Sequence, residues 1–408
     1  MLLEMNLMLL PILILFPLSL IEFIFPNNER MNKQVYFIAF AISYFIVAIK
    51  YYYGPDIAIY VNLYDSLSSP IKDLINPPKS SLDTERLFIF FFSFLKSIGC
   101  SYWFCSVIIT TIYFAAIYNL FTSLNKYKTF ALFLIVLFDA NLLFFEFRQN
   151  LTVALFLFSL SAYYKRSYFV CVLLAVLSFF IHKSAVFVYM LMILLLFFQR
   201  VKVSKTIFLV ASGLLLVFLF LPIDQIIIWI ISKTPASTNV IESVKHHLMY
   251  TKTFQIIFFV YAIVLLLLIF SVENKDLNSK YAKIVALFFI VVSISYRDWF
   301  FLNRLRSYFL PVVIVYLIPI LSQSKSKQIW ISKLAVCLIY LYSINYARGI
   351  WLSNYYSEAK LLNSTTIFSR FYKSENEIRR ENMRKASYFF QKEYMKNNIE
   401  EYNKSIKE

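Results

Sequence analysis

The sequence predicts an all-α, polytopic integral membrane protein, and three observations carry this prediction. Of its 408 residues, 60% are hydrophobic and only 15% are charged, whereas about a quarter of the residues in a soluble domain are charged. Apolar runs of roughly 20 residues recur along the chain, and this is the length that an α-helix needs to cross a hydrocarbon core. Lys and Arg gather in short turns between alternate runs, which is typical of cytoplasmic loops.

Taken in order, the apolar runs predict about 12 membrane spans. The expected spans are 7–25, 35–49, 102–121, 129–145, 151–164, 168–181, 185–198, 207–221, 254–270, 284–294, 310–321 and 329–346. The run 85–98 is short, and we expect it either to cross as a thirteenth span or to form a tilted or re-entrant helix. Glu4 and the lack of a basic stretch before the first run indicate that this span is retained rather than cleaved.

Two longer loops are expected on the outer side. The basic residues of loop 27–33 place it in the cytoplasm, which puts the turn-rich, acidic stretch 54–84 outside. A second outer loop covers 222–252, and its apolar part 223–231 is expected at the membrane interface. The basic turns that then face the cytoplasm are 126–128, 165–166, 200–205, 275–283 and 325–327.

Residues 1–350 are predicted to form one transmembrane domain, which a basic, charged tail at 351–408 follows. Alternating charges in the tail, such as Glu377, Arg379 and Glu381, indicate a solvated helix. The register of spans puts the tail outside, although its basic residues favour the cytoplasm. Long segments follow the charge rule poorly, so the sequence leaves the side of the tail open.

The formal net charge of +17 does not indicate a nucleic-acid partner, because the basic cytoplasmic turns account for it. The four cysteines lack metal-ligand spacing and are expected to pack as small apolar residues. Glu242 and His246 stand four residues apart with His247 adjacent, but no third well-spaced ligand follows, so no metal site is predicted. The chain also lacks a Gly-rich phosphate loop and a nucleophile elbow, and no cofactor is expected.

Arg148 and His182 stand at the outer tips of one predicted membrane hairpin. Its arms, 151–164 and 168–181, each rise roughly 20–25 Å, so the two residues return to about the same depth. Ionisable groups beside a span are costly and mark a candidate functional site. His182 is suited to accept a proton from a hydroxyl near neutral pH.

Arg304 and Arg306 are expected at the same outer level. Together with Arg148 they would suit an anionic ligand, because a guanidinium stays charged and grips phosphate through two N–H groups. The alternatives are that each arginine pairs with a carboxylate or reaches lipid headgroups, and that the candidate base simply anchors a helix end. Asp56 and Glu85 could orient a hydroxyl or pair with an outer arginine. The outer aromatic residues could stack on sugar rings or form an interfacial belt.

Several short motifs, in their order along the chain, resemble the EpsG-like branch of bacterial polysaccharide polymerases. They are Gly54-Pro55-Asp56 with Tyr60, Glu85 opening an apolar run, Arg148-Gln149, Phe180-Ile181-His182-Lys183-Ser184-Ala185 and Arg304-Leu305-Arg306-Ser307-Tyr308-Phe309. The resemblance covers residues 30–320 and does not extend to the tail.

The resemblance implies a Wzy-type polymerase of O-antigen, capsule or exopolysaccharide in the bacterial inner membrane, with its active face outward. Such an enzyme transfers a growing glycan from undecaprenyl diphosphate to a lipid-linked repeat unit and needs no metal. Its partners are the lipid-linked donor and acceptor, membrane lipid and a candidate chain-length regulator. The resemblance implies His182 as base or acceptor guide, and Arg148 and Arg304 on the diphosphate. The implied substrate-binding residues are Gln149, Arg306, Tyr308, Asp56, Tyr60 and Glu85.

Other classes remain as alternatives. A flippase for lipid-linked oligosaccharides would have a similar span count, but its ionisable groups would line a route inside the bundle. A polysaccharide acyltransferase would use a histidine base within the membrane. A ligase to lipid A would share the arginine-and-histidine chemistry and differ only in its acceptor. A transferase of single sugars from a lipid monophosphate would use acidic residues in an early outer loop, such as Asp56 and Asp65.

Overall fold

The computed structural model describes residues 7–52, 57–78, 84–198, 300–322, 336–344 without 338 and 342, and 366–382 without 372. Across these residues the regular structure is helical, apart from one antiparallel bridge between Lys50 and Thr366. The predicted all-α class is therefore confirmed for this part of the chain. The chain divides into two compact units: the first is Met1–Lys183 with Leu338–Glu408, and the second is Ser184–Cys337.

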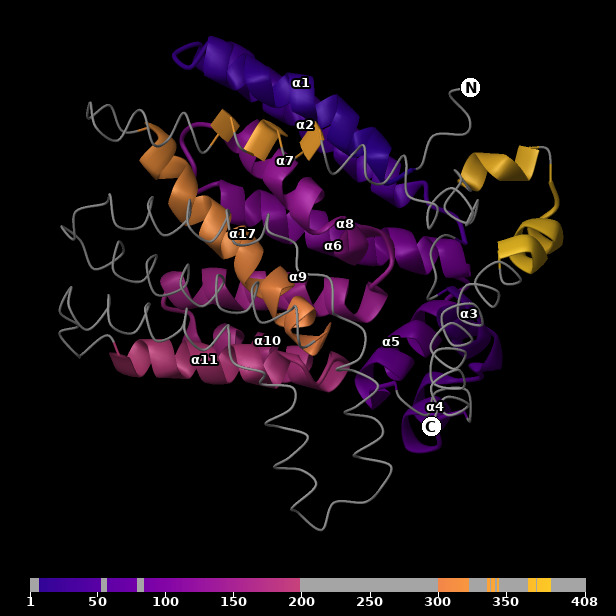
Figure 1. Cartoon of the computed structure of the whole chain (residues 1–408). Coiled ribbons are helices and arrows are strands. Elements are labelled where there is room, and N and C mark those ends of the chain that lie inside the picture. Colours follow the sequence, from indigo (N-terminus) through magenta and orange to yellow (C-terminus); the bar gives the residue numbers. More distant parts are fainter. Residues whose placement is uncertain are drawn as a thin grey trace, which may run out of the picture. The chain divides into compact units, whose positions relative to one another are not determined.

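The first unit holds the described helices that precede residue 184. They are α1 (Leu9–Ile24), α2 (Glu29–Ala48), α3 (Ile57–Ser66), α4 (Pro70–Ile75), α5 (Arg86–Ser97), α6 (Tyr102–Phe121), α7 (Lys128–Phe138), α8 (Ala140–Phe144), α9 (Phe147–Tyr164) and α10 (Tyr168–Ile181). Helices α1, α2, α6, α7, α9 and α10 pack side by side, and α3, α4 and α5 gather at one end of them (Figure 1). Among the described helices, α2 and α6 are long and apolar enough to span a membrane.

The predicted hairpin is present as α9 and α10. The bounds of α10 coincide with the predicted arm 168–181, whereas α9 begins at Phe147, four residues before the predicted arm 151–164. The Ser159 hydroxyl of α9 donates a hydrogen bond to the Cys171 carbonyl of α10 over 3.0 Å. The turn between the helices uses Arg166 in the left-handed region, at φ 59°.

The run 129–145, predicted as one span, is not one continuous helix. Helix α7 ends at Asp139, and the short α8 is followed by a second break before Phe147. The apolar run alone does not indicate these breaks, but Asp139 within it indicates the first. An aspartate competes for nearby backbone hydrogen bonds and ends helices readily. Lys50 Nζ donates to the carbonyl of Leu143, one of the groups left open where α8 ends.

Glu22 connects α1 to the first turn of α7. Its carboxylate accepts hydrogen bonds from the backbone N–H groups of Thr129 and Phe130, each over 3.0 Å, at the start of α7. Lys126 Nζ donates to Asn27 Oδ1 over 3.1 Å. The basic turn 126–128 therefore lies beside the loop that connects α1 and α2.

Helices α3, α4 and α5 form a small group of their own. The buried Asp73 carboxylate of α4 accepts hydrogen bonds from the Ser68 and Ser93 hydroxyls. Lys96 Nζ of α5 donates to the carbonyls of Tyr64 and Leu67 at the end of α3. A helix of α5's length rises only roughly 18 Å, and its bonds tie it to these two short helices.

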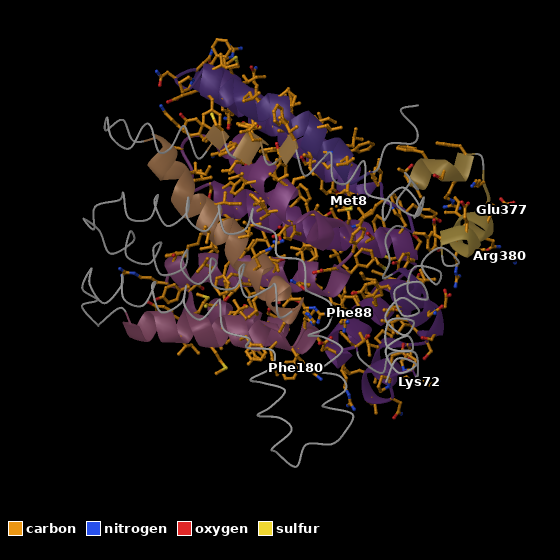
Figure 2. The ribbon with its side chains drawn as sticks, in the orientation of Figure 1. Met8, Lys72, Phe88, Phe180, Glu377 and Arg380 are labelled. Atoms are coloured by element: carbon orange, nitrogen blue, oxygen red, sulfur yellow. The ribbon has the colours of Figure 1, made fainter. Side chains whose placement is uncertain are left out.

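The C-terminal segment 366–382 packs at the same end of the first unit as α3. The Ile367 N–H donates to the Ile49 carbonyl over 2.9 Å, and Arg379 forms an ion pair with Asp65 of α3. Ile378 is only 1% exposed and belongs to the core that also holds Phe88 and Phe147. Figure 2 shows the charged residues Glu377 and Arg380 of this segment and Phe88 within the core. The described part of the C-terminal segment thus lies at the end of the first unit where α2 ends.

The second unit contains α11 (Ala185–Phe198) and α17 (Phe300–Ser322), which pack against each other. The motif Arg304 to Phe309 lies within α17, although the sequence predicted it to precede a span at 310–321. No Gly or Pro stands between residues 300 and 310 to end the helix, so the helix begins earlier than the apolar run. The expected outer loop 222–252, with the Glu242 and His246 pair, lies outside the described residues.

Candidate functional site

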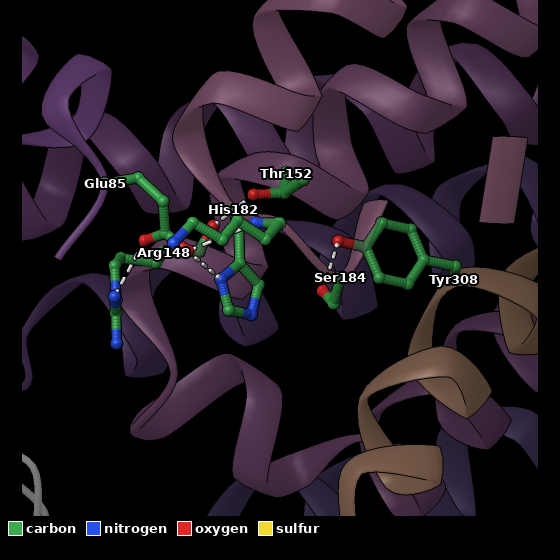
Figure 3. A network of polar contacts seen from close by, with 7 residues as sticks. Glu85, Arg148, Thr152, His182, Ser184 and Tyr308 are labelled. Atoms are coloured by element: carbon green, nitrogen blue, oxygen red, sulfur yellow. Dashed lines mark hydrogen bonds and ion pairs between the residues drawn. The ribbon is translucent and has the colours of Figure 1, made fainter. Parts of the chain in front are cut away.

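Three side chains of the first unit meet at the ends of three helices. Glu85 directly precedes α5, Arg148 lies in the first turn of α9, and His182 follows the last residue of α10. The backbone of His182 is extended, with φ −155° and ψ 117°, so the chain leaves the helix at this residue. Figure 3 shows the three side chains turned toward one another. Residues that are far apart in the sequence thus form one polar cluster.

The Glu85 carboxylate connects the cluster through both of its oxygens. Oε2 lies 2.8 Å from Arg148 Nη1, and Oε1 lies 3.1 Å from His182 Nδ1. The backbone N–H of Lys183 also donates to Oε1, over 3.1 Å. The side chains of Glu85 and His182 are 9% and 8% exposed, and that of Arg148 is 18% exposed. These contacts fix the relative positions of α5, α9 and the end of α10.

Glu85 is held in its ionised form. Burial on its own would raise the pKa of this carboxyl, but the hydrogen bond from His182 and the positive charge of Arg148 oppose that effect. Together they lower the pKa of Glu85 from 4.5 to about 2. At neutral pH the carboxylate can therefore only accept hydrogen bonds.

This ionisation determines which nitrogen of His182 carries a proton. An acceptor-only carboxylate requires Nδ1 of the imidazole to be the donor, which leaves Nε2 with its lone pair in the neutral ring. A carboxylate that orients a histidine in this way also stabilises the imidazolium formed when Nε2 takes up a proton. The geometry is that of a general base supported by a positioning carboxylate.

Aromatic residues surround the arginine end of the cluster. The ring of Tyr60 stacks on Phe147, with centroids 5.1 Å apart and planes at 28°. Tyr60 is 4% exposed, and its hydroxyl is a further hydrogen-bond partner of the Arg148 guanidinium. The Tyr102 ring of α6 lies 6.1 Å from Phe147. Tyr60, which the sequence predicts to contact substrate, contacts Phe147 and Arg148 in this structure.

Backbone and hydroxyl contacts hold the helices that carry the cluster. The Thr152 hydroxyl donates to the Arg148 carbonyl over 2.6 Å within α9. The Ser178 hydroxyl of α10 donates to the Thr152 carbonyl over 3.4 Å. Figure 3 shows Thr152 close to the polar cluster. Small polar residues thus bring α9 and α10 together directly beside Arg148 and His182.

Sequence reasoning missed Lys50, which lies next to the same aromatic residues. Its ammonium group is 5.0 Å from the centroid of the Phe147 ring, and the residue is 3% exposed. Burial lowers the pKa of Lys50 to about 7. One signal could have indicated it: Lys50 is the only charged residue between Lys33 and Asp56. A lone lysine at the end of an apolar span is expected to have a structural or functional partner.

The structure also describes four other predicted site residues, Gln149, Arg304, Arg306 and Tyr308. Gln149 is 3% exposed within α9. In the second unit, Tyr308 is fully buried, and its hydroxyl lies 3.3 Å from the Ser184 hydroxyl. Arg304 and Arg306 are partly exposed on α17, and their grouping with Arg148 stays a prediction. Asp56 lies outside the described residues.

The described residues contain no group of three His, Cys, Asp or Glu side chains that could hold a metal ion. Of the four cysteines, Cys105 is buried, Cys100 and Cys171 are partly buried, and Cys337 is exposed.

The family model described as the EpsG family matches residues 5–364, which is nearly the whole chain. Neither the curated proteins nor the solved structures give a significant match. The matched range contains Glu85, Arg148 and His182, together with Arg304.

Proposed function

Because the chain belongs to the EpsG family, a polysaccharide-related family of membrane proteins, we propose that it is a membrane glycosyltransferase that polymerises lipid-linked repeat units. The donor in this proposal is a growing glycan on undecaprenyl diphosphate, and the acceptor is a single repeat unit on the same lipid. The product is O-antigen or capsular polysaccharide. The proposed place of reaction is the outer face of the bacterial inner membrane.

The proposed reaction is one substitution at the anomeric carbon of the donor. The hydroxyl at the non-reducing end of the acceptor forms the new C–O bond, and the bond between that carbon and the phosphate oxygen breaks. The hydroxyl proton passes to a base, and undecaprenyl diphosphate leaves with the bonding electron pair. The enzyme must therefore supply a proton acceptor and positive charge near the departing diphosphate.

The Glu85–His182 hydrogen bond is the single observation that carries this proposal. It leaves Nε2 of His182 as the proton acceptor for the acceptor hydroxyl, and Glu85 acts as a positioning residue. Arg148 contributes a positive charge beside them. In the same proposal Arg304, with Arg306 in support, stabilises charge on the diphosphate. These roles need no metal ion.

Deletion of the gene, followed by gel analysis of surface polysaccharide, tests the function. Loss of long polymer with persistence of single-repeat material is the expected result. Loss of all surface-exposed repeat units would instead indicate a flippase, and unchanged chain length with altered acetylation would indicate an acyltransferase. Complementation with the intact gene must restore the polymer, so that effects on neighbouring genes are excluded.

A further inference from the structure

Two cationic residues, to which the proposed mechanism gives no role, are sequence neighbours of the polar cluster. Arg86 follows Glu85 as the first residue of α5, and Lys183 follows His182. Both side chains are exposed. The backbone N–H of Lys183 donates a hydrogen bond to the Glu85 carboxylate. The backbone that carries both cationic side chains is therefore held in place at the cluster.

Neither side chain has a carboxylate partner among the residues that the structure describes. The charged residues of the C-terminal segment behave differently. Arg370 pairs with Glu375 over 3.4 Å, Lys373 pairs with Glu381 over 2.7 Å, and the third pair joins Arg379 to Asp65. Arg86 and Lys183 have no such acid beside them in the described part of the chain, as is also true of Lys165 and Arg166 in the turn between α9 and α10.

The location of these cations also runs against the usual distribution of charge. The turns at 126–128 and 165–166 carry the basic residues expected on the cytoplasmic side. Arg86 and Lys183 lie at the other end of the helices, and in the proposed orientation that end is outside, where the positive-inside rule disfavours Lys and Arg. A local ligand is a better explanation for them than membrane orientation.

We propose that Arg86 and Lys183 bind the diphosphate of the lipid-linked donor, directly beside the Glu85–His182 pair. The inference rests on the proposed function, and it adds two residues to the site. During the substitution, the attacking hydroxyl and the departing phosphate oxygen are both bonded to the same carbon. A phosphate subsite must therefore lie close to the base. Lys183 directly follows His182, and Arg86 directly follows Glu85, which is hydrogen-bonded to His182.

The two side chains also have suitable chemistry for a diphosphate. A guanidinium donates two parallel N–H groups to phosphate oxygens, and an ammonium group adds a compact charge on a flexible stem. Glu85 and His182 remain fixed by buried contacts while the exposed cations reach the ligand. An anionic phospholipid headgroup offers the same phosphate chemistry, so the test must separate the two sources.

The test compares binding of three lipids to full-length protein purified in neutral detergent micelles. The probes are undecaprenyl diphosphate, undecaprenyl monophosphate and phosphatidylglycerol, and the Kd of each is measured by thermophoresis. The double variant Arg86→Gln/Lys183→Gln is compared with wild type. The matched control is Lys165→Gln/Arg166→Gln, which removes two exposed cations from the turn between α9 and α10.

We expect the double variant to raise the Kd for undecaprenyl diphosphate at least about tenfold, and the Kd for phosphatidylglycerol to change far less. The control variant should bind all three lipids as wild type does. Exchange of the cations, as Arg86→Lys/Lys183→Arg, should restore most of the affinity and so exclude a folding defect.

An unchanged Kd for undecaprenyl diphosphate in the Gln variant would overturn the inference, and so would an equal loss for phosphatidylglycerol, which would indicate a headgroup contact. Failure of the proposed function gives a different result: the gene deletion would then leave long polymer in place. If long polymer depends on the gene and the Gln variant binds normally, only the diphosphate subsite is wrong.

Discussion

Glu85 Oε1 lies 3.1 Å from His182 Nδ1, although the two residues are 97 positions apart in the sequence. The contact joins the start of α5 to the end of α10. Because the carboxylate is ionised, it selects the histidine tautomer whose Nε2 can accept a proton. A surface ion pair would not need this arrangement, whereas a general base would.

Replacement of Glu85 by Gln should remove this selection while it keeps the size of the side chain. A neutral amide can donate as well as accept, so the imidazole is free to carry its proton on Nε2. We expect polymer formation to fall by about 100-fold or more. The rate is measured with lipid-linked repeat units and membranes from a deletion strain that expresses the variant. Glu85→Asp, which keeps a carboxylate, should retain more activity than Glu85→Gln; equal activity of Gln variant and wild type would contradict the role.

Replacement of His182 by Ala should lower the rate by about 10²- to 10⁴-fold, because the acceptor hydroxyl loses its base. Added imidazole should restore part of the rate, since it can occupy the space of the missing ring and accept the proton. Glu85 keeps its contacts with Arg148 and the Lys183 N–H, so the variant should still fold. Full-length polymer at the wild-type rate without imidazole would exclude His182 as the base.

Replacement of Arg148 by Ala should destabilise the protein and not only the reaction. The guanidinium and Glu85 form a largely buried pair, with side chains 18% and 9% exposed. Removal of one partner leaves an uncompensated charge, which costs about 3–5 kcal/mol. Thermal unfolding in detergent should therefore show a lower midpoint for Arg148→Ala. The double variant Arg148→Ala/Glu85→Gln should recover part of the loss, whereas a simple sum of two losses would contradict the ion-pair argument.

The lowered pKa of Glu85 predicts a specific loss of stability in acid. The carboxyl has a pKa of about 2 in the folded protein and 4.5 as its ordinary value. Its contribution to the free energy of unfolding is fully present above about pH 4.5 and is lost as the pH falls through about 2. The shift corresponds to roughly 3 kcal/mol. The free energy of unfolding, measured with denaturant over this pH range, should fall more steeply with decreasing pH for wild type than for Glu85→Gln. Parallel curves for the two proteins would contradict the shift.

Much of the helical framework could be predicted from hydrophobic runs. The bounds of α6 and α10 coincide with the predicted spans 102–121 and 168–181, because basic or polar turns delimit these runs. The same reasoning placed Arg148 and His182 at one end of a hairpin. It could not show which carboxylate they share, because that contact depends on how α5 packs against α10.

Breaks inside apolar runs and contacts across the chain were less predictable. Asp139 divides the run 129–145. One carboxylate hardly changes the hydropathy of such a run, so hydropathy alone does not reveal the break. Lys50 is buried because α2 ends against the α8–α9 junction, which no local pattern reveals. The C-terminal segment likewise binds residues more than 300 positions earlier in the chain, and its charge alone left its side of the membrane open.

The position of the C-terminal segment leads to a prediction about topology. Glu375 accepts a hydrogen bond from the Tyr52 hydroxyl, and Arg379 pairs with Asp65, so the segment lies on the side of the stretch between α2 and α5. That side is the proposed outer face. Cysteines at Phe371 and Ile71, which are 85% and 71% exposed, should therefore react with a membrane-impermeant maleimide in intact spheroplasts. A cysteine at Lys165 should react only after the membrane is opened.

The comparison requires a background without native thiols, in which the four cysteines are replaced by Ala. These are Cys100, Cys105, Cys171 and Cys337. Phe371→Cys and Ile71→Cys must behave alike, whichever face they occupy, because the contacts of Tyr52 and Asp65 hold both segments at one end of the first unit. Labelling of Phe371→Cys together with Lys165→Cys, and not with Ile71→Cys, would contradict the packing of the tail. Labelling of all but Lys165→Cys from outside would establish that the Glu85–His182 pair and the tail share the outer face.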